Sequence, residues 1–82
     1  LIHPNPYFPS KHSTLNMSNL PENSQIEIYN LSGNLLLSQK ASKQFSWDHK
    51  LQNGNHLNTS ILLIKITNLD DKSYEIKKVM VE

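Results

Sequence analysis

The sequence contains no cysteine and only two glycines, Gly33 and Gly54, among its 82 residues. The absence of cysteine excludes disulfide bonds and thiolate metal sites. Two glycines are too few for a phosphate-binding loop or a dinucleotide fingerprint. The net charge of +1 also lacks the basic excess of a nucleic-acid-binding protein. We therefore expect no cofactor and no nucleic-acid partner.

Long hydrophobic runs are also missing. The longest run is "ILLI" at residues 61–64, whereas a membrane-spanning helix needs about 20 apolar residues. The chain starts at Leu1 without the basic and apolar segments of a signal peptide. We therefore expect no membrane span. We also expect the chain to be a piece of a longer protein, in which residues 1–3 form the end of a linker.

Catalytic and metal-binding patterns are equally scarce. The four histidines are His3, His12, His49 and His56. They lack the close spacing that would place two metal ligands on one face of a helix or strand. No G-x-S-x-G motif occurs. No combination of residues assembles a nucleophile, a base and an oxyanion donor. We predict neither an enzyme nor a metal site.

What the sequence does contain is a series of short apolar segments separated by turn residues. "QIEIYN" at 25–30 alternates cleanly, with Ile26 and Ile28 on one face and Glu27 and Tyr29 on the other. Further strands are expected at residues 13–17, 35–39, 43–48, 60–67 and 74–81. Six or seven short strands at this spacing predict an all-β domain, a small antiparallel β-sandwich.

The two glycines fall where hairpin turns are expected. Gly33 stands in "LSGN" after residues 25–30, and Gly54 stands in "QNGN" before residues 60–67. Tight hairpin turns require positive φ, which glycine adopts without steric cost. We predict positive φ at both positions.

The last two strands carry different patterns. Residues 60–67 are apolar at both parities, which predicts a central strand covered on both sides. In residues 74–81, Tyr74 and Ile76 share one parity whereas Val79 and Val81 share the other, so we predict a bulge at Lys77–Lys78.

Trp47 permits two interpretations. On an alternating strand beside Phe45 it is typical of the core of a sandwich, whereas an exposed tryptophan would suit stacking on a sugar ring. We favour the core, and burial of Trp47 would distinguish the two.

In order, "HPNP", "IEIYNLSGNLL", "FSWD", "NGN", "ILLIKI" and "KKVMV" resemble the C-terminal sorting domain of the type IX secretion system of Bacteroidetes. The resemblance is strongest to its variant akin to the Ig-like domain of flagellar hook-capping proteins. It implies an Ig-like or fibronectin-like antiparallel sandwich of about seven strands, occupying residues 4–82. The residues that match the family's motifs are Pro4, Asn5, Pro6, Tyr29, Gly33, Trp47, Asp48, Gly54, Lys77, Lys78, Val79 and Val81.

The resemblance implies a non-catalytic address. Such a domain passes through the periplasm and is recognised by the outer-membrane translocon and its shuttle proteins. A sortase then attaches the parent protein to the cell surface, or the parent is released outside the cell. We expect a monomer, and contacts of Lys77 and Lys78 with the secretion machinery beside their protection of an edge strand.

Three alternatives stay open. The domain could be an Ig-like spacer, or a carbohydrate-binding accessory domain of a secreted protein. It could also be a retained domain of a secretion-machinery component, since His49 stands where the family usually has glycine after the W-D pair.

The proline-rich start also allows more than one interpretation. Pro4 and Pro6 lack N–H donors, so a strand containing them can pair only at an edge. We predict that "PNPYFP" forms the first rung of the sandwich, with a linker or a ligand for a proline-binding module as less favoured interpretations.

Overall fold

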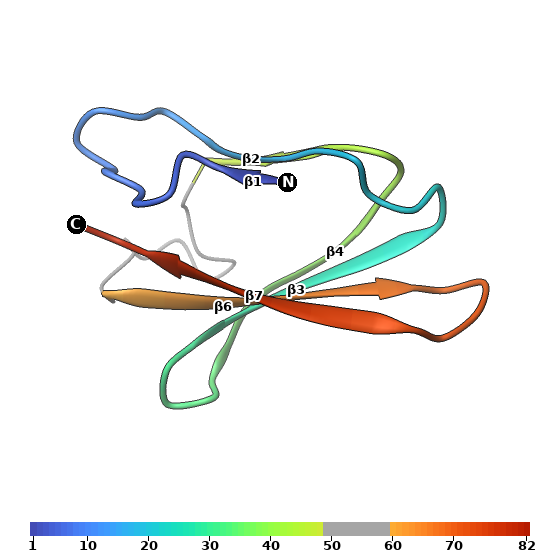
Figure 1. Cartoon of the computed structure of the whole chain (residues 1–82). Helices are drawn as coiled ribbons and strands as arrows, with labels where there is room; N and C mark the ends of the chain where they lie inside the picture. Colours follow the sequence, from blue (N-terminus) through green and yellow to red (C-terminus); the bar gives the residue numbers. More distant parts are fainter. Residues whose placement is uncertain (49–59) are drawn as a thin grey trace.

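The computed structural model describes residues 1–48 and 60–82, and over these residues the chain forms seven β-strands in two antiparallel sheets (Figure 1). The strands are β1 (Ile2–His3), β2 (Leu15–Met17), β3 (Ser24–Asn30), β4 (Leu35–Ala41), β5 (Phe45–Trp47), β6 (Ile61–Asn68) and β7 (Tyr74–Met80). The predicted all-β sandwich of about seven strands is confirmed.

The strands are divided unequally between the sheets. One sheet has the order β1-β2-β5, and the other has the order β4-β3-β6-β7. The chain crosses between layers three times, after β2, after β4 and after β5. The three-stranded sheet lies across one face of the four-stranded sheet (Figure 1). Because its strands have only two or three residues, it covers only part of that face.

The core lies between the sheets and follows the period of two that strands impose. Ile26 and Ile28 of β3 are fully buried, whereas Glu27 and Tyr29 between and beside them are half-buried on the outer face. The core is completed by Tyr7, Leu15, Met17, Leu20, Trp47, Leu62, Ile64, Ile66 and Val79. The alternation read from residues 25–30 is confirmed.

Trp47 is 3% exposed, and Phe45 on the same strand packs against the same core. Its strand is β5, where Trp47 pairs with Leu15 of β2. The predicted core position is confirmed, and a buried indole ring offers no platform for a sugar.

The β3–β4 hairpin turns at Gly33, which has φ of 90°. The N–H of Asn30 donates to the carbonyl of Asn34, and the N–H of Gly33 donates to the carbonyl of Asn30. The prediction of positive φ is therefore confirmed at Gly33. Gly54 lies outside the described residues.

Two strand predictions were wrong in detail. The first strand is Ile2–His3, which pairs with β2, so it begins before the segment "PNPYFP" in which we expected it. In that segment Tyr7 forms an isolated bridge to Val81. The assignment of residues 1–3 to the end of a linker stays a prediction about the longer parent.

The predicted bulge at Lys77–Lys78 is also wrong, because β7 pairs with β6 in unbroken register from Tyr74 to Met80. The apolar pattern changes parity for another reason. Glu75 and Lys77 do occupy inner-face positions, opposite Ile66 and Ile64. They remain exposed because the short three-stranded sheet does not reach over them.

The expectation that β6 is covered on both sides needs a similar correction. The strand is central, between β3 and β7. However, only Leu62, Ile64 and Ile66 are buried, while Ile61 and Leu63 on the outer face are half-buried. The outer face of β6 is therefore only partly covered.

Candidate functional site

The edge of β7 is the candidate site, because an edge strand directs half of its main-chain hydrogen-bonding groups away from its sheet. The N–H of Val81 donates to Ser60 on the β6 side. Main-chain direction alternates along a strand, so Tyr74, Ile76, Lys78 and Met80 direct their N–H and C=O groups outward. These groups can pair with another segment.

Asn5 covers part of this edge with its side chain. Its Oδ1 accepts from the N–H of Met80 at 3.2 Å, and its Nδ2 donates to the carbonyl of Lys78 at 3.3 Å. One amide thus makes both bonds that a neighbouring strand would make at this position. The peptide bonds before Pro4 and Pro6, on either side of Asn5, are cis.

Tyr7 continues the cover with its main chain. Its N–H donates to the carbonyl of Met80 at 2.7 Å, and its carbonyl accepts from the N–H of Glu82 at 2.8 Å. The side chain is fully buried and stacks on His12, with ring centroids 5.9 Å apart. Burial, and then the negative charge of Asp48, raise the pKa of the Tyr7 phenol. Tyr7 therefore joins the end of β7 to the core.

The part of β7 from Tyr74 to Lys78 is not covered in this way. Tyr74 and Ile76 are 61% and 57% exposed on the outer face. Lys65 places its Nζ 4.5 Å from the centroid of the Tyr74 ring, a cation–π contact. Lys77 lies 3.8 Å from Glu75, but an ion pair this exposed adds little stability. This part of the edge is open to solvent.

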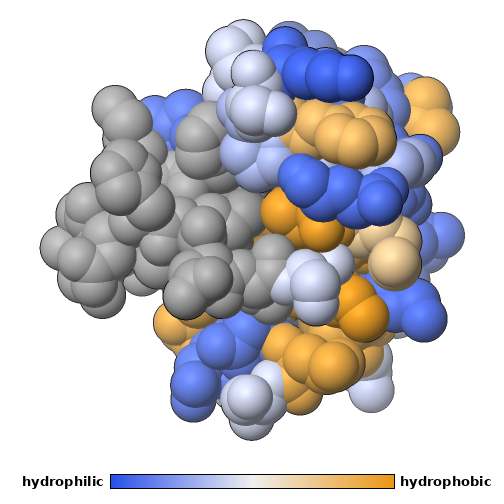
Figure 2. Space-filling view, turned by 90° about the vertical axis from the view of Figure 1, so that its left-hand side faces the viewer, coloured by the Kyte–Doolittle hydropathy of each residue, from blue (hydrophilic) through white to orange (hydrophobic). Residues whose placement is uncertain are grey.

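A cleft lies between the N-terminal residues of the chain and the open edge of β7. Its volume is about 260 Å³, and its lining combines apolar side chains with basic and acidic ones: Leu1, Ile2, Asn5, Glu75, Lys77, Lys78 and Val79. Figure 2 looks onto the end of the molecule at which β7 finishes, and apolar surface lies there between polar groups. An edge with free main-chain groups therefore borders a partly apolar recess.

The structure brings together some of the predicted site residues and separates others. Asn5, Lys77, Lys78 and Val79 meet around the cleft, and Val81 pairs with Tyr7 just after Pro6. The two lysines lie on opposite faces of β7, because adjacent strand residues alternate.

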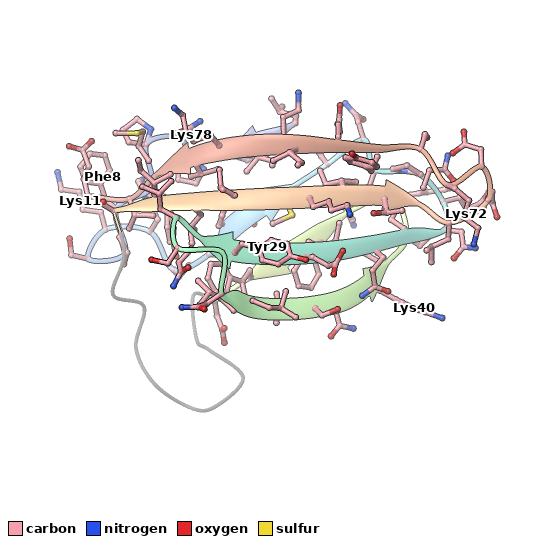
Figure 3. All side chains as sticks on the ribbon, turned by 90° about the horizontal axis from the view of Figure 1, so that it is seen from below. Phe8, Lys11, Tyr29, Lys40, Lys72 and Lys78 are labelled. Atoms are coloured by element: carbon pink, nitrogen blue, oxygen red, sulfur yellow. The ribbon has the colours of Figure 1, made fainter. Side chains whose placement is uncertain are left out.

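The remaining predicted residues serve other parts of the fold. Tyr29 lies on the outer face of the four-stranded sheet, where its hydroxyl donates to Glu27 Oε2 at 3.1 Å (Figure 3). Its pKa is raised by burial first, and then by the hydrogen bond and charge of Glu27. Gly33 shapes the β3–β4 turn, and Trp47 fills the core. Asp48 is exposed and acts on Tyr7 through its charge.

Sequence reasoning missed Tyr7 and Ile76. The signal for Tyr7 was its place directly after Pro4-Asn5-Pro6 in a chain with few aromatic residues. The signal for Ile76 was an apolar residue between Glu75 and Lys77 on a strand expected to be an edge.

Among residues 1–48 and 60–82, no group of three histidine, aspartate or glutamate side chains is placed to hold a metal ion. Over the same residues the chain has no helix of the length and apolar character that crossing a membrane requires.

Comparison with known proteins places this chain in a family. A model of the family described as "Secretion system C-terminal sorting domain" matches residues 1–82. The chain belongs to this family of sorting domains, which direct proteins through type IX secretion. The predicted membership in the type IX secretion C-terminal sorting domains is thereby confirmed.

A solved structure shows the same fold. It is that of PorZ, an essential bacterial surface component of the type-IX secretion system of Porphyromonas gingivalis, with a TM-score of 0.87 and 17% sequence identity. The alignment covers 100% of this chain and 11% of the PorZ chain, so the chain spans about a tenth of that protein's length. No curated protein matches.

As a type IX sorting domain, the chain directs export through the outer membrane to the cell surface or the extracellular space.

Proposed function

We propose that the domain is a non-catalytic address that the type IX outer-membrane machinery recognises by direct protein contact. The observation that supports this most strongly is the family match over residues 1–82. The open edge of β7 gives such a contact a physical basis, because edge strands bind extended segments of other proteins through main-chain hydrogen bonds.

In this proposal the parent first crosses the inner membrane and the domain folds in the periplasm as a monomer. The translocon and its shuttle proteins bind the folded domain, and a sortase attaches the parent to the cell surface. The specific residues of the address lie at and beside the open edge: Asn5, Lys77, Lys78, Val79 and Val81.

Lys77 and Lys78 supply the positive charge of this surface, and Glu75 beside Lys77 supplies a negative charge. The two lysines are exposed on opposite faces of β7, so a partner seated on the edge meets both. Protection against edge-to-edge aggregation explains one lysine as well as two, whereas positive charge on the outer face, at Lys78, also suits an acidic partner surface.

The test of the proposed function is a fusion of residues 1–82 behind a reporter that carries an inner-membrane export signal, in a host with a working type IX system. We expect the reporter at the cell surface or in the medium, and in the periplasm when the domain is omitted. Equal distributions of the two reporters would contradict the function.

The role of the two lysines is tested in the same assay with Lys77→Glu and Lys78→Glu together. Solvated lysines contribute little to folding, so the melt should stay within a few degrees while the reporter accumulates in the periplasm. The matched control is Lys40→Glu with Lys72→Glu, which changes the charge equally at exposed positions elsewhere. If a folded Lys77/Lys78 variant is exported at the parental level, these lysines do not contact the machinery and serve only to protect the strand edge from aggregation.

A second candidate is a domain that stays on a component of the secretion machinery. The fold shared with PorZ favours it, because PorZ is itself a surface component of such a system. In the fusion assay this alternative predicts that the reporter reaches the surface with the domain still attached.

A further inference from the structure

The open edge of β7 is limited to one stretch. Asn5 and Tyr7 occupy the carbonyl of Lys78, both main-chain groups of Met80 and the N–H of Glu82. The outward N–H of Lys78 and the outward groups of Ile76 and Tyr74 lie beyond this cover. An extended segment could pair with β7 here without displacing any hydrogen bond found among residues 1–48 and 60–82.

The surroundings of this stretch define what the segment must carry. A strand added beside β7 would alternate its side chains between the two faces of the sheet. Side chains on the inner face would point toward the cleft of about 260 Å³, where Leu1 and Ile2 supply apolar lining and Glu75 and Lys77 supply charges of opposite sign. Those on the outer face would meet Lys78 and Lys65, which lies opposite Ile76, so acidic residues are favoured on that face. On the inner face the charge of Lys77 is offset by Glu75, 3.8 Å away.

We infer that an extended segment of the export machinery adds as a fifth strand to the sheet at Tyr74–Lys78, places acidic side chains against Lys78 on the outer face and inserts an apolar side chain into the cleft beside Ile2. This inference rests on the proposed function and specifies its site. Asn5 and Tyr7 set the register of the added strand, because they leave only this part of the edge unpaired.

The test removes an outward N–H group without touching the β6–β7 ladder. Proline is tolerated on an edge strand where its missing N–H would face solvent. Ile76→Pro and Lys78→Pro each delete one such donor. In the reporter assay we expect a folded variant to lower surface delivery about fivefold or more, as the loss of one main-chain hydrogen bond at the interface implies.

The matched control is Lys40→Pro, at the opposite edge of the same sheet (Figure 3). The N–H of Asn30 faces β4, and Ile26 and Ile28, which face the same way, pair with Gln39 and Leu37. Lys40 therefore directs its N–H outward, as Ile76 does. We expect this variant to deliver the reporter at the parental level.

Reporter delivery is interpreted only for variants whose thermal melt shows that they fold. One folded variant, Ile76→Pro or Lys78→Pro, is enough for the test. Parental delivery with a folded Ile76→Pro or Lys78→Pro domain would overturn the added strand while the proposed function stands. Equal losses with Lys40→Pro would overturn it too, because the effect would not belong to the β7 edge. Failure of the unmodified domain to deliver the reporter would instead reject the proposed function.

Discussion

The side-chain amide of Asn5 binds the main chain on both sides of Val79, through the N–H of Met80 and the carbonyl of Lys78. Because these residues stand more than 70 positions apart in the sequence, this amide ties the start of the chain to its last strand. It is also the boundary between the covered and the open parts of the β7 edge.

Asn5→Ala should therefore loosen the end of β7. Two exposed hydrogen bonds are lost, and we expect the free energy of unfolding to fall by about 1 kcal/mol. Amide hydrogen exchange at Met80 should accelerate more than exchange at Ile64, in the central strand. Unchanged exchange at Met80 would show that the amide does not hold β7.

Asn5→Asp separates the two bonds of the amide. The carboxylate can still accept from Met80, but it cannot donate to the carbonyl of Lys78 and would repel it. We expect a loss of stability at neutral pH that becomes smaller when the carboxyl is protonated, measured by thermal melts at pH 7 and pH 3 relative to the parent. A parental melt at pH 7 would contradict the donor role of Nδ2.

Trp47→Ala tests the core. The ring is 3% exposed, and truncation of a buried tryptophan should cost about 3–5 kcal/mol. This is enough to unfold a domain with the usual marginal stability. Denaturant unfolding followed by circular dichroism measures the loss, and a mutant melting within a few degrees of the parent would reject the core assignment.

Gly33→Ala tests the hairpin backbone apart from packing. A Cβ at this position would meet no atom within 4 Å, so any cost comes from φ of 90°. We expect a loss of about 1 kcal/mol, seen as a lower midpoint of denaturation with an unchanged slope. Unchanged stability would mean that this turn does not require glycine.

The stability of the turn between β6 and β7 should depend on pH through Asp71. Asp71 accepts from the hydroxyl and the N–H of Ser73 at 2.6 and 2.9 Å. These hydrogen bonds hold the pKa of Asp71 below its ordinary value. The stabilisation is present at pH values above the pKa of the unfolded state, about 3.9, and is lost as the pH falls through the lower folded pKa.

Ser73→Ala removes the hydroxyl bond and keeps the main-chain bond. We expect the pKa of Asp71, followed by NMR titration of its carboxyl carbon, to rise toward the ordinary value. An unchanged titration would show that the hydroxyl of Ser73 does not stabilise the carboxylate.

Sequence reasoning succeeded where local physics decides the structure. The alternation in β3, the glycine turn at Gly33 and the burial of Trp47 each follow from a period or a turn that a few residues specify. It failed at β7, where exposure of Glu75 and Lys77 depends on how far the other sheet extends. The hydrogen bonds of Asn5 and Tyr7 to the end of β7 leave no periodic pattern in the sequence, because they join segments that only the complete fold brings together.

The same limit applies to the candidate site. The resemblance selected Asn5, Lys77 and Lys78, but it could not indicate that they border one cleft, or that Ile76 lies at the centre of the open edge.

The central claim, that this domain is an export address, is tested most directly by the ratio of surface to periplasmic reporter in two matched hosts. One host has an intact type IX translocon and the other lacks it, and both express the reporter fused to residues 1–82. The account predicts a high ratio only in the first host, and retention in the periplasm of the second. The same ratio in both hosts would contradict it.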